Sequence, residues 1–214
     1  AVPGIDPHRN GVWGVSSSGG IAAVHAAVAP RLAAAVLPVP AFGDSRAPGE
    51  PDNSTVASIR HTVVDADLDS FERTVDGPLP IVSPSQLGFA SFLETLTSYH
   101  WFISYGSRYG TGWENRVTIV RLQTPVPFDA QACVPMIEVP VMMVVAEHDE
   151  QPGADSDVAR QVFERANDPK VLFEIAGGHF GAIYHNSPEF ILSATAQQRF
   201  LQEHLVGVEP RHRR

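Results

Sequence analysis

The chain is poor in cysteine, in basic residues and in long apolar runs, and each shortage excludes a class of protein. Its 214 residues include a single cysteine, Cys133, so no disulfide can form within the chain. Lys and Arg number 15 against 24 Asp and Glu, and the formal net charge of -9 argues against a surface that binds nucleic acid or anionic lipid. No apolar run reaches the roughly 18 residues that span a bilayer. We therefore expect a cytoplasmic protein without nucleic-acid or membrane partners.

Motifs for metals and nucleotides are missing as well. The sequence has no CxxC, no HExxH, no P-loop and no GxGxxG, the patterns that hold zinc, phosphates or dinucleotides. We expect no metal and no cofactor. Cys133 has no nearby His or Asn pattern of a nucleophile, so we expect an inert buried thiol. The hydrophobic content of 43% is enough for one substantial core.

Segments of strand and helix type alternate at both ends of the chain. The expected strands lie at 11–15, 33–37, 139–146 and 170–175. The expected helices lie at 17–28, 155–166 and 188–205. The run VPVMMVVA is apolar throughout, which is typical of a strand buried on both faces. Strands that alternate with helices predict a parallel sheet in an α/β fold.

The middle of the chain has a different character. It begins rich in Pro, Asp and Ser, and it then carries aromatic residues at irregular spacing without an alternating strand pattern. We expect an inserted subdomain made mostly of loops and helices. The chain thus divides into an N-terminal βαβ part at 1–43, the insertion at 44–135, and a C-terminal part of the same core at 136–214.

The segment GVWGVSSSGG places three serines between an expected strand and an expected helix. A nucleophile elbow needs this order, with the serine in a strained turn and small residues two positions before and after it. Ser16 has Gly14 and Ser18 at those positions and follows the strand directly. Ser17 has the larger Val15 two positions before it, and Ser18 would already lie inside the helix. Ser16 is therefore the candidate nucleophile, and the alternative is that the serines only cap a helix.

A serine becomes a good nucleophile only when a base takes its proton and an acid stands behind the base. In folds with such an elbow the acid follows a late strand, and the histidine follows the next strand. The chain supplies Asp149 after VPVMMVVA and His179 after KVLFEI, both at C-terminal strand ends, where open parallel sheets place ligand sites. Glu147 and Glu150 are rival acids.

The elbow segment resembles the G-x-S-x-S-G-G elbow of the α/β-hydrolase superfamily. The resemblance is strongest to the branch of bacterial esterase-like hydrolases related to X-Pro dipeptidyl peptidases, cocaine esterase and fungal polyketide acyl transferases. Three further segments are similar to that branch, namely GWENRV at 112–117, NDPK at 167–170 and GGHF at 177–180. The resemblance implies an α/β-hydrolase fold with Ser16 as nucleophile, Asp149 as acid, His179 as base and a helical cap over the pocket. A tyrosine often follows the nucleophile in that branch, where this chain has Ser17.

Such a triad implies acyl-enzyme chemistry on a small-molecule acyl substrate. His179 would take the Ser16 proton, Ser16 would attack a carbonyl, and an acceptor would then remove the acyl group. The backbone N–H of Ser17 would serve as one donor of the oxyanion hole. We expect a serine hydrolase of carboxylic esters or related acyl compounds. An acyl transferase with the same triad and a non-catalytic fragment remain open alternatives.

The elbow lies unusually near the start of the chain. In related hydrolases it follows several strands and the loop that supplies the second oxyanion donor, so the chain resembles the C-terminal part of a hydrolase. We expect a sheet of the later strands only, in chain order. Its first strand would then be an open edge carrying Val12, Trp13 and Val15, which a preceding segment, a partner chain or self-association would have to cover.

Overall fold

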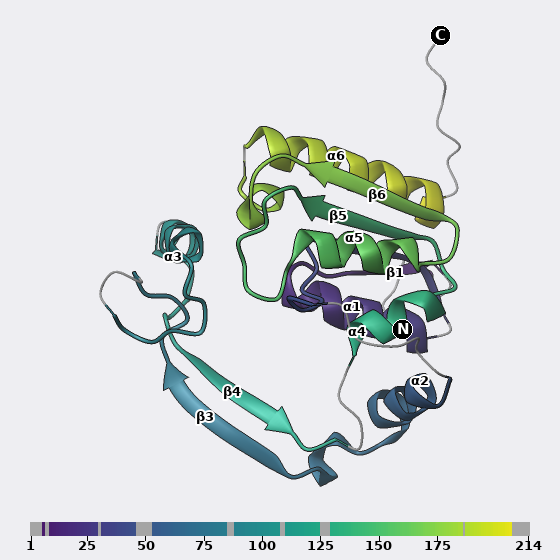
Figure 1. Cartoon of the computed structure of the whole chain (residues 1–214), viewed down its shortest axis with the longest axis horizontal. Coiled ribbons are helices and arrows are strands. Elements are labelled where there is room, and N and C mark those ends of the chain that lie inside the picture. The colour runs from purple at the N-terminus through teal and green to yellow at the C-terminus, as the bar shows by residue number, and fades with distance from the viewer. Residues whose placement is uncertain are drawn as a thin grey trace. The chain divides into compact units, whose positions relative to one another are not determined.

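A computed structural model of the chain describes residues 6, 9–29, 31–45, 53–84, 88–107, 110–124, 129–185 and 187–206. The chain divides into two compact units. One consists of Ala1–Asp65 and Val126–Arg214, and the other of Ala66–Pro125. The first unit contains a parallel sheet with helices on both faces (Figure 1).

In the described residues of the first unit, the sheet has four parallel strands in the order β1-β2-β5-β6. The strands are β1 (Asn10–Trp13), β2 (Leu32–Pro38), β5 (Val141–Ala146) and β6 (Lys170–Ile175). Every residue of β5 is buried, as expected for a central strand that is covered on both sides. Among the described residues, β1 pairs with β2 alone. The predicted chain order is therefore confirmed, and β1 is an edge strand within the described residues.

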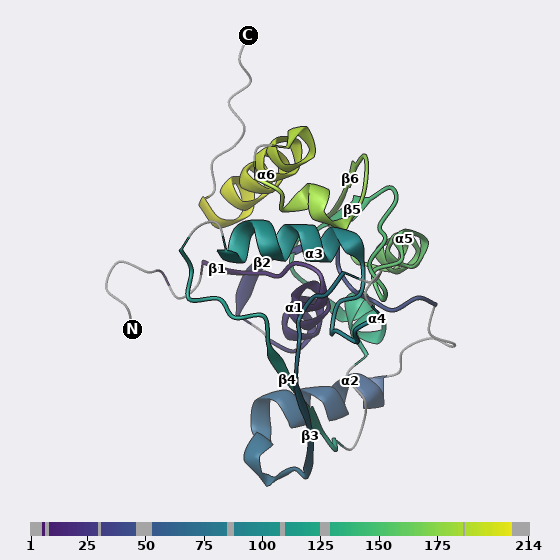
Figure 2. The ribbon, with the colours of Figure 1, turned by 90° about the vertical axis from the view of Figure 1, so that its left-hand side faces the viewer.

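Helices cover both faces of this sheet (Figure 2). They are α1 (Ser17–Val28), α5 (Ser156–Glu164) and α6 (Pro188–Leu201). Side chains alternate between the two faces along a strand. Leu37 and Met143 accordingly pack in one cluster with residues of α1 and α5, whereas Val36 and Met142 pack in another with residues of α6. In the described part of the chain, no helix combines the length and the apolar character that crossing a membrane requires.

The predicted α/β core is confirmed, with small shifts at its element ends. The helix at 17–28 and the strand at 170–175 have the predicted bounds. The first strand ends at Trp13 rather than at Val15, because Gly14 and Val15 already lead into the turn before α1. The closing helix α6 continues as a π-helical segment, η7 (Gln202–Val206).

Between β2 and β5 the first unit contains three further short helical pieces. They are α2 (Asn53–Arg60) with its π-helical continuation η1 (His61–Asp65), α4 (Ala130–Cys133), and the 3₁₀ turn η5 (Val134–Met136). Ile59 and Cys133 from these pieces are fully buried and pack with Val24 and Val28 of α1. These contacts attach both ends of the insertion to the core.

The second unit is built around an antiparallel pair, β3 (Arg73–Leu79) and β4 (Val117–Leu122), with the helix α3 (Leu96–Phe102). We expected a mostly helical insertion at 44–135, and this strand pair is a correction to that expectation. Gly77 and Pro78 interrupt β3 where its register shifts, and most residues of the pair are exposed. A pair without a buried face has no need of the apolar alternation by which strands are predicted.

Candidate active site

Ser16 lies in the turn between β1 and α1 with backbone angles φ 58 and ψ -125. A residue with a Cβ pays about 1–3 kcal/mol for such a conformation, which persists only where the surroundings enforce it. Here the N–H of Ser16 donates to the carbonyl of Pro38 at 3.0 Å, and its carbonyl accepts from the N–H of Ala41 at 2.9 Å. The loop after β2 therefore holds the turn in its strained shape.

Glycines next to Ser16 allow two close backbone approaches. A Cβ at Gly14 would lie 2.1 Å from the carbonyl oxygen of Ser18, and a Cβ at Gly19 would lie 2.9 Å from Cα of Pro40. Because Gly14 and Ser18 stand two positions before and after Ser16, the turn brings these two backbones into contact. This contact is the physical reason for the small residue two positions before the elbow serine.

The three consecutive serines differ in their surroundings. Ser17 and Ser18 are exposed residues in the first turn of α1, whereas Ser16 precedes the helix. The Ser16 side chain caps no helix N–H, and its hydroxyl bonds to no other described residue. Helix capping therefore does not account for Ser16. The N–H of Ser17 also lacks an acceptor among the described residues, so it is available to an incoming oxygen.

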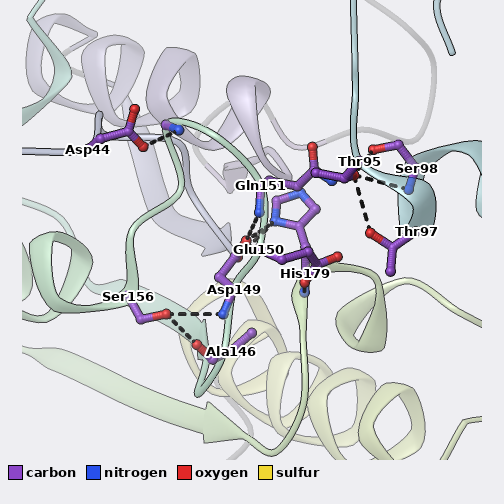
Figure 3. Close-up of polar contacts among 11 residues, drawn as sticks. Asp44, Thr95, Thr97, Ser98, Ala146, Asp149, Glu150, Gln151, Ser156 and His179 are labelled. Carbon is purple, nitrogen blue, oxygen red and sulfur yellow. Dashed lines mark hydrogen bonds and ion pairs between the residues drawn. The ribbon is translucent and has the colours of Figure 1, made fainter. Parts of the chain in front are cut away.

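His179 and Asp149 are paired beyond the C-terminal ends of β6 and β5 (Figure 3). Nδ1 of His179 lies 2.8 Å from Oδ2 and 2.9 Å from Oδ1 of Asp149. The two side chains are only 3% and 2% exposed. A neutral imidazole that donates from Nδ1 to a carboxylate keeps its lone pair on Nε2. In that tautomer the ring can take a proton from a hydroxyl.

The loop after β5 determines where Asp149 points. Its Oδ1 accepts the N–H of Gln151 at 3.0 Å, and its own N–H donates to Oγ of Ser156 at 3.4 Å. Ser156 in turn donates to the carbonyl of Ala146, the last residue of β5, at 2.7 Å. These bonds tie the loop to the strand end and to the start of α5. The carboxylate consequently faces the imidazole of His179 (Figure 3).

The two rival acids have other partners. Glu147 has a side chain that is 59% exposed and lies 4.0 Å from Nε2 of His148. Oε2 of Glu150 accepts the backbone N–H of His179 at 2.9 Å. Among the described residues, Asp149 is the carboxylate that contacts the His179 ring.

No group of three or more His, Cys, Asp or Glu in the described part of the chain is arranged to hold a metal ion.

All three candidate residues follow C-terminal strand ends and so lie at one edge of the parallel sheet. The loop after β2 contacts both parts of this edge, because it bonds to Ser16 while Val39 and Pro40 lie with Asp149 around a small gap in the packing. Ser16 and His179 are not hydrogen-bonded to each other in this structure, and catalytic hydrogen bonds often form only with substrate present. Their direct contact stays a prediction.

The sequence did not identify Val39, which is a second residue with a strained backbone besides Ser16. Val39 has φ 41, and it is the other non-glycine residue with a positive φ among the described residues. It lies between Pro38 and Pro40, and its N–H donates to the carbonyl of Val144 at 2.8 Å. A proline pushes the residue before it toward an extended backbone with negative φ, so the sequence gives no sign of the positive φ at Val39.

Comparison with known proteins gives structural but no sequence relatives. No family model matches the chain, and no curated protein shows significant similarity to it. The α/β hydrolase GrgF from Penicillium sp. sh18 is similar with a TM-score of 0.57 and 24% identity, over 94% of this chain and 65% of that one. DcsB, solved in complex with its substrate analogue, is similar with a TM-score of 0.59 and 18% identity, over 95% of this chain and 68% of that one. For the monoacylglycerol lipase of Paleococcus ferrophilus the TM-score is 0.50 and the identity 13%, over 91% and 69% of the two chains.

These likenesses, together with the parallel sheet and its flanking helices, show that the chain has the α/β-hydrolase fold. The chain spans 65% of the length of GrgF and 68% of that of DcsB. Because a fold hosts many functions, the activity has to be argued from the site itself.

Proposed function

We propose that the chain carries the catalytic residues of a serine hydrolase that acts on carboxylic esters or related acyl compounds. Ser16 is the nucleophile, His179 the general base and Asp149 the acid that orients it. The observation that carries this proposal is the backbone of Ser16. A serine at φ 58 that neither caps its helix nor bonds to another described residue is costly, and such strain is concentrated at functional sites.

The chemistry follows from the groups present. Nε2 of His179 takes the proton of the Ser16 hydroxyl while Oγ attacks the carbonyl carbon of the substrate. The tetrahedral intermediate collapses when His179 returns the proton to the leaving group, and the acyl group stays on Ser16 as an ester. Water, deprotonated by His179, then releases the acid. Asp149 stabilises the imidazolium that forms in each step, because its buried carboxylate lies 2.8 Å from Nδ1.

The N–H of Ser17 supports the negative charge on the substrate oxygen in this proposal. It belongs to the residue after the nucleophile, at the N-terminus of α1, where N–H groups have no partner within the helix. One such donor contributes about 2.7–4 kcal/mol to lowering the barrier. An oxyanion hole usually has a second donor, which we propose comes from a segment other than the turn of Ser16.

A cytoplasmic location is a further part of the proposal, and the single free cysteine supports it.

Labelling with a fluorophosphonate probe tests the proposal, because such probes react with activated serines. Mass spectrometry should find the adduct on Ser16, and Ser16→Ala should abolish it. Ser18→Ala is the matched control, since Ser18 is exposed in α1 and has no role in the chemistry. An unlabelled wild-type chain, or equal labelling of Ser16→Ala, would contradict the assignment. An acyl transferase would use the same residues, and product analysis with a competing alcohol separates transfer from hydrolysis.

A further inference from the structure

Glu150 follows Asp149 in the chain and reaches the same histidine from a different side (Figure 3). Its Oε2 accepts the backbone N–H of His179 at 2.9 Å, whereas Asp149 contacts the ring. A Cβ at Gly178, the residue before the histidine, would lie 2.1 Å from that same Oε2. The carboxylate of Glu150 therefore occupies space that is open because position 178 is glycine.

This contact continues the pairing of two strands beyond their ends. After β5 and β6, the N–H of Glu147 donates to the carbonyl of Ile175 at 2.9 Å, and the N–H of His148 donates to that of Gly177 at 2.9 Å. On the second loop the N–H of His179 donates to a side-chain acceptor, Oε2 of Glu150 on the first loop, instead of to a backbone carbonyl. His179 opens the 3₁₀ turn η6 (His179–Ala182), so its N–H has no partner inside that turn.

We propose that Glu150 is a positioning residue that fixes the backbone of His179 while Asp149 fixes its ring. The inference rests on the proposed role of His179 as the general base. A ring held only through Nδ1 can still swing with its main chain, and a second bond at the main-chain nitrogen removes that freedom. Glu150 acts here as a hydrogen-bond acceptor, so an amide oxygen in its place can do the same work.

Three variants test this role. Glu150→Ala removes the acceptor, Glu150→Gln keeps an acceptor without the charge, and Glu147→Ala is the matched control on the same loop, because the Glu147 side chain is 59% exposed. With p-nitrophenyl acetate we expect Glu150→Ala to lower kcat about tenfold at little change in KM, which corresponds to the loss of one hydrogen bond. Glu150→Gln should stay within about twofold of wild type, because its amide oxygen retains the bond. Glu147→Ala should match wild type.

An NMR measurement reports on the histidine without any turnover. The proton between Nδ1 of His179 and Asp149 should give a downfield resonance in wild type, in Glu150→Gln and in Glu147→Ala. In Glu150→Ala it should broaden or disappear while circular dichroism shows an intact fold. If wild type neither labels nor hydrolyses ester, the proposed function fails, and this resonance still decides the role of Glu150.

Gly178→Ala provides an independent test from the opposite side of the contact. The added methyl group would displace the Glu150 carboxylate, so this variant should reproduce the kcat loss and the NMR change of Glu150→Ala. In the Glu150→Ala background it should add less than about twofold to the loss, because the two changes break one shared contact. The next neighbour of that methyl group outside Glu150 is the carbonyl oxygen of His148 at 3.4 Å, and φ of -104 at Gly178 suits alanine.

Two results would overturn the proposal. The first is a Glu150→Ala protein with wild-type kcat and an unchanged His179 resonance, which would make the contact incidental. The second is a Glu150→Gln protein as impaired as Glu150→Ala, which would show that the negative charge matters and not the accepted hydrogen bond.

Discussion

Replacing Ser16 with glycine should abolish catalysis and yet give a more stable protein than replacing it with alanine. Both substitutions remove the hydroxyl. The backbone at this position has φ 58 and ψ -125, which glycine adopts readily and alanine does not. Ser16→Ala keeps the Cβ and with it the strain, whereas Ser16→Gly relieves the strain.

The size of the difference follows from two opposing contributions. Relief of a strained backbone conformation stabilises the folded state by about 1–3 kcal/mol. Glycine in turn loses more conformational freedom on folding, which costs about 0.5–1 kcal/mol. We therefore expect the glycine variant to be more stable than the alanine variant by up to about 2.5 kcal/mol. In a chain of this size 1 kcal/mol moves the melting temperature by about 2–4 °C, so the Tm of the glycine variant should be higher by up to about 10 °C.

Thermal unfolding followed by circular dichroism, together with urea unfolding, measures this difference. Ser17 is the matched control, because it lies in α1 and has a helical backbone. There the order should reverse, with Ser17→Gly less stable than Ser17→Ala by up to about 1 kcal/mol. The reasoning is refuted if Ser16→Gly melts below Ser16→Ala, since that would mean that no strain is stored at the elbow.

Two further predictions concern the buried thiol and the sheet edge. Burial raises the pKa of Cys133 to about 12, with the negative charge of Asp129 adding to the rise, so a thiol reagent at pH 8 should modify the protein only after unfolding. Because the folded pKa lies above the unfolded one, this thiol's contribution to stability should be complete below about pH 9 and decline as pH rises toward 12, and urea midpoints of wild type and Cys133→Ala should converge or cross in that range. The open edge of β1, where Trp13 is 53% exposed, should make the protein self-associate, and Trp13→Lys should shift it toward monomer in light scattering. A monodisperse wild-type monomer would argue against this interpretation of the edge.

The core could be predicted from the sequence because its signals are local. β5 is apolar at every position and buried at every position, and α1 is rich in alanine, the residue with the highest helix propensity. The pairing of Asp149 with His179 could be predicted for a related reason. The C-terminal ends of parallel strands share one edge of the sheet, so knowing the strands is enough to bring together the residues that follow them.

The strand pair of the second unit and the role of Glu150 depend on contacts that leave no periodic pattern in the sequence. The strand pair β3 and β4 has little buried surface, so its residues need not alternate. The role of Glu150 depends on one bond between a side chain and a backbone N–H that lies 29 positions further along the chain. Glu150 looked equivalent to Glu147 as a rival acid, and only the three-dimensional course of the two loops separates them.

The geometry of the site depends on the buried centre of the sheet more than on the loops that carry it. Pro38 of β2 is the register partner of Val144 in β5, and the same Pro38 accepts the N–H of Ser16. Two residues after Val144, β5 ends and the loop of Asp149 begins. A slip of one residue between β2 and β5 would reverse the faces of every side chain in the strand and bury the wrong set, so the register is strongly specified. The strained turn of Ser16 can persist because the acceptor of its N–H, Pro38, belongs to the buried strand β2. The pairing of β2 with β5 holds this acceptor in place.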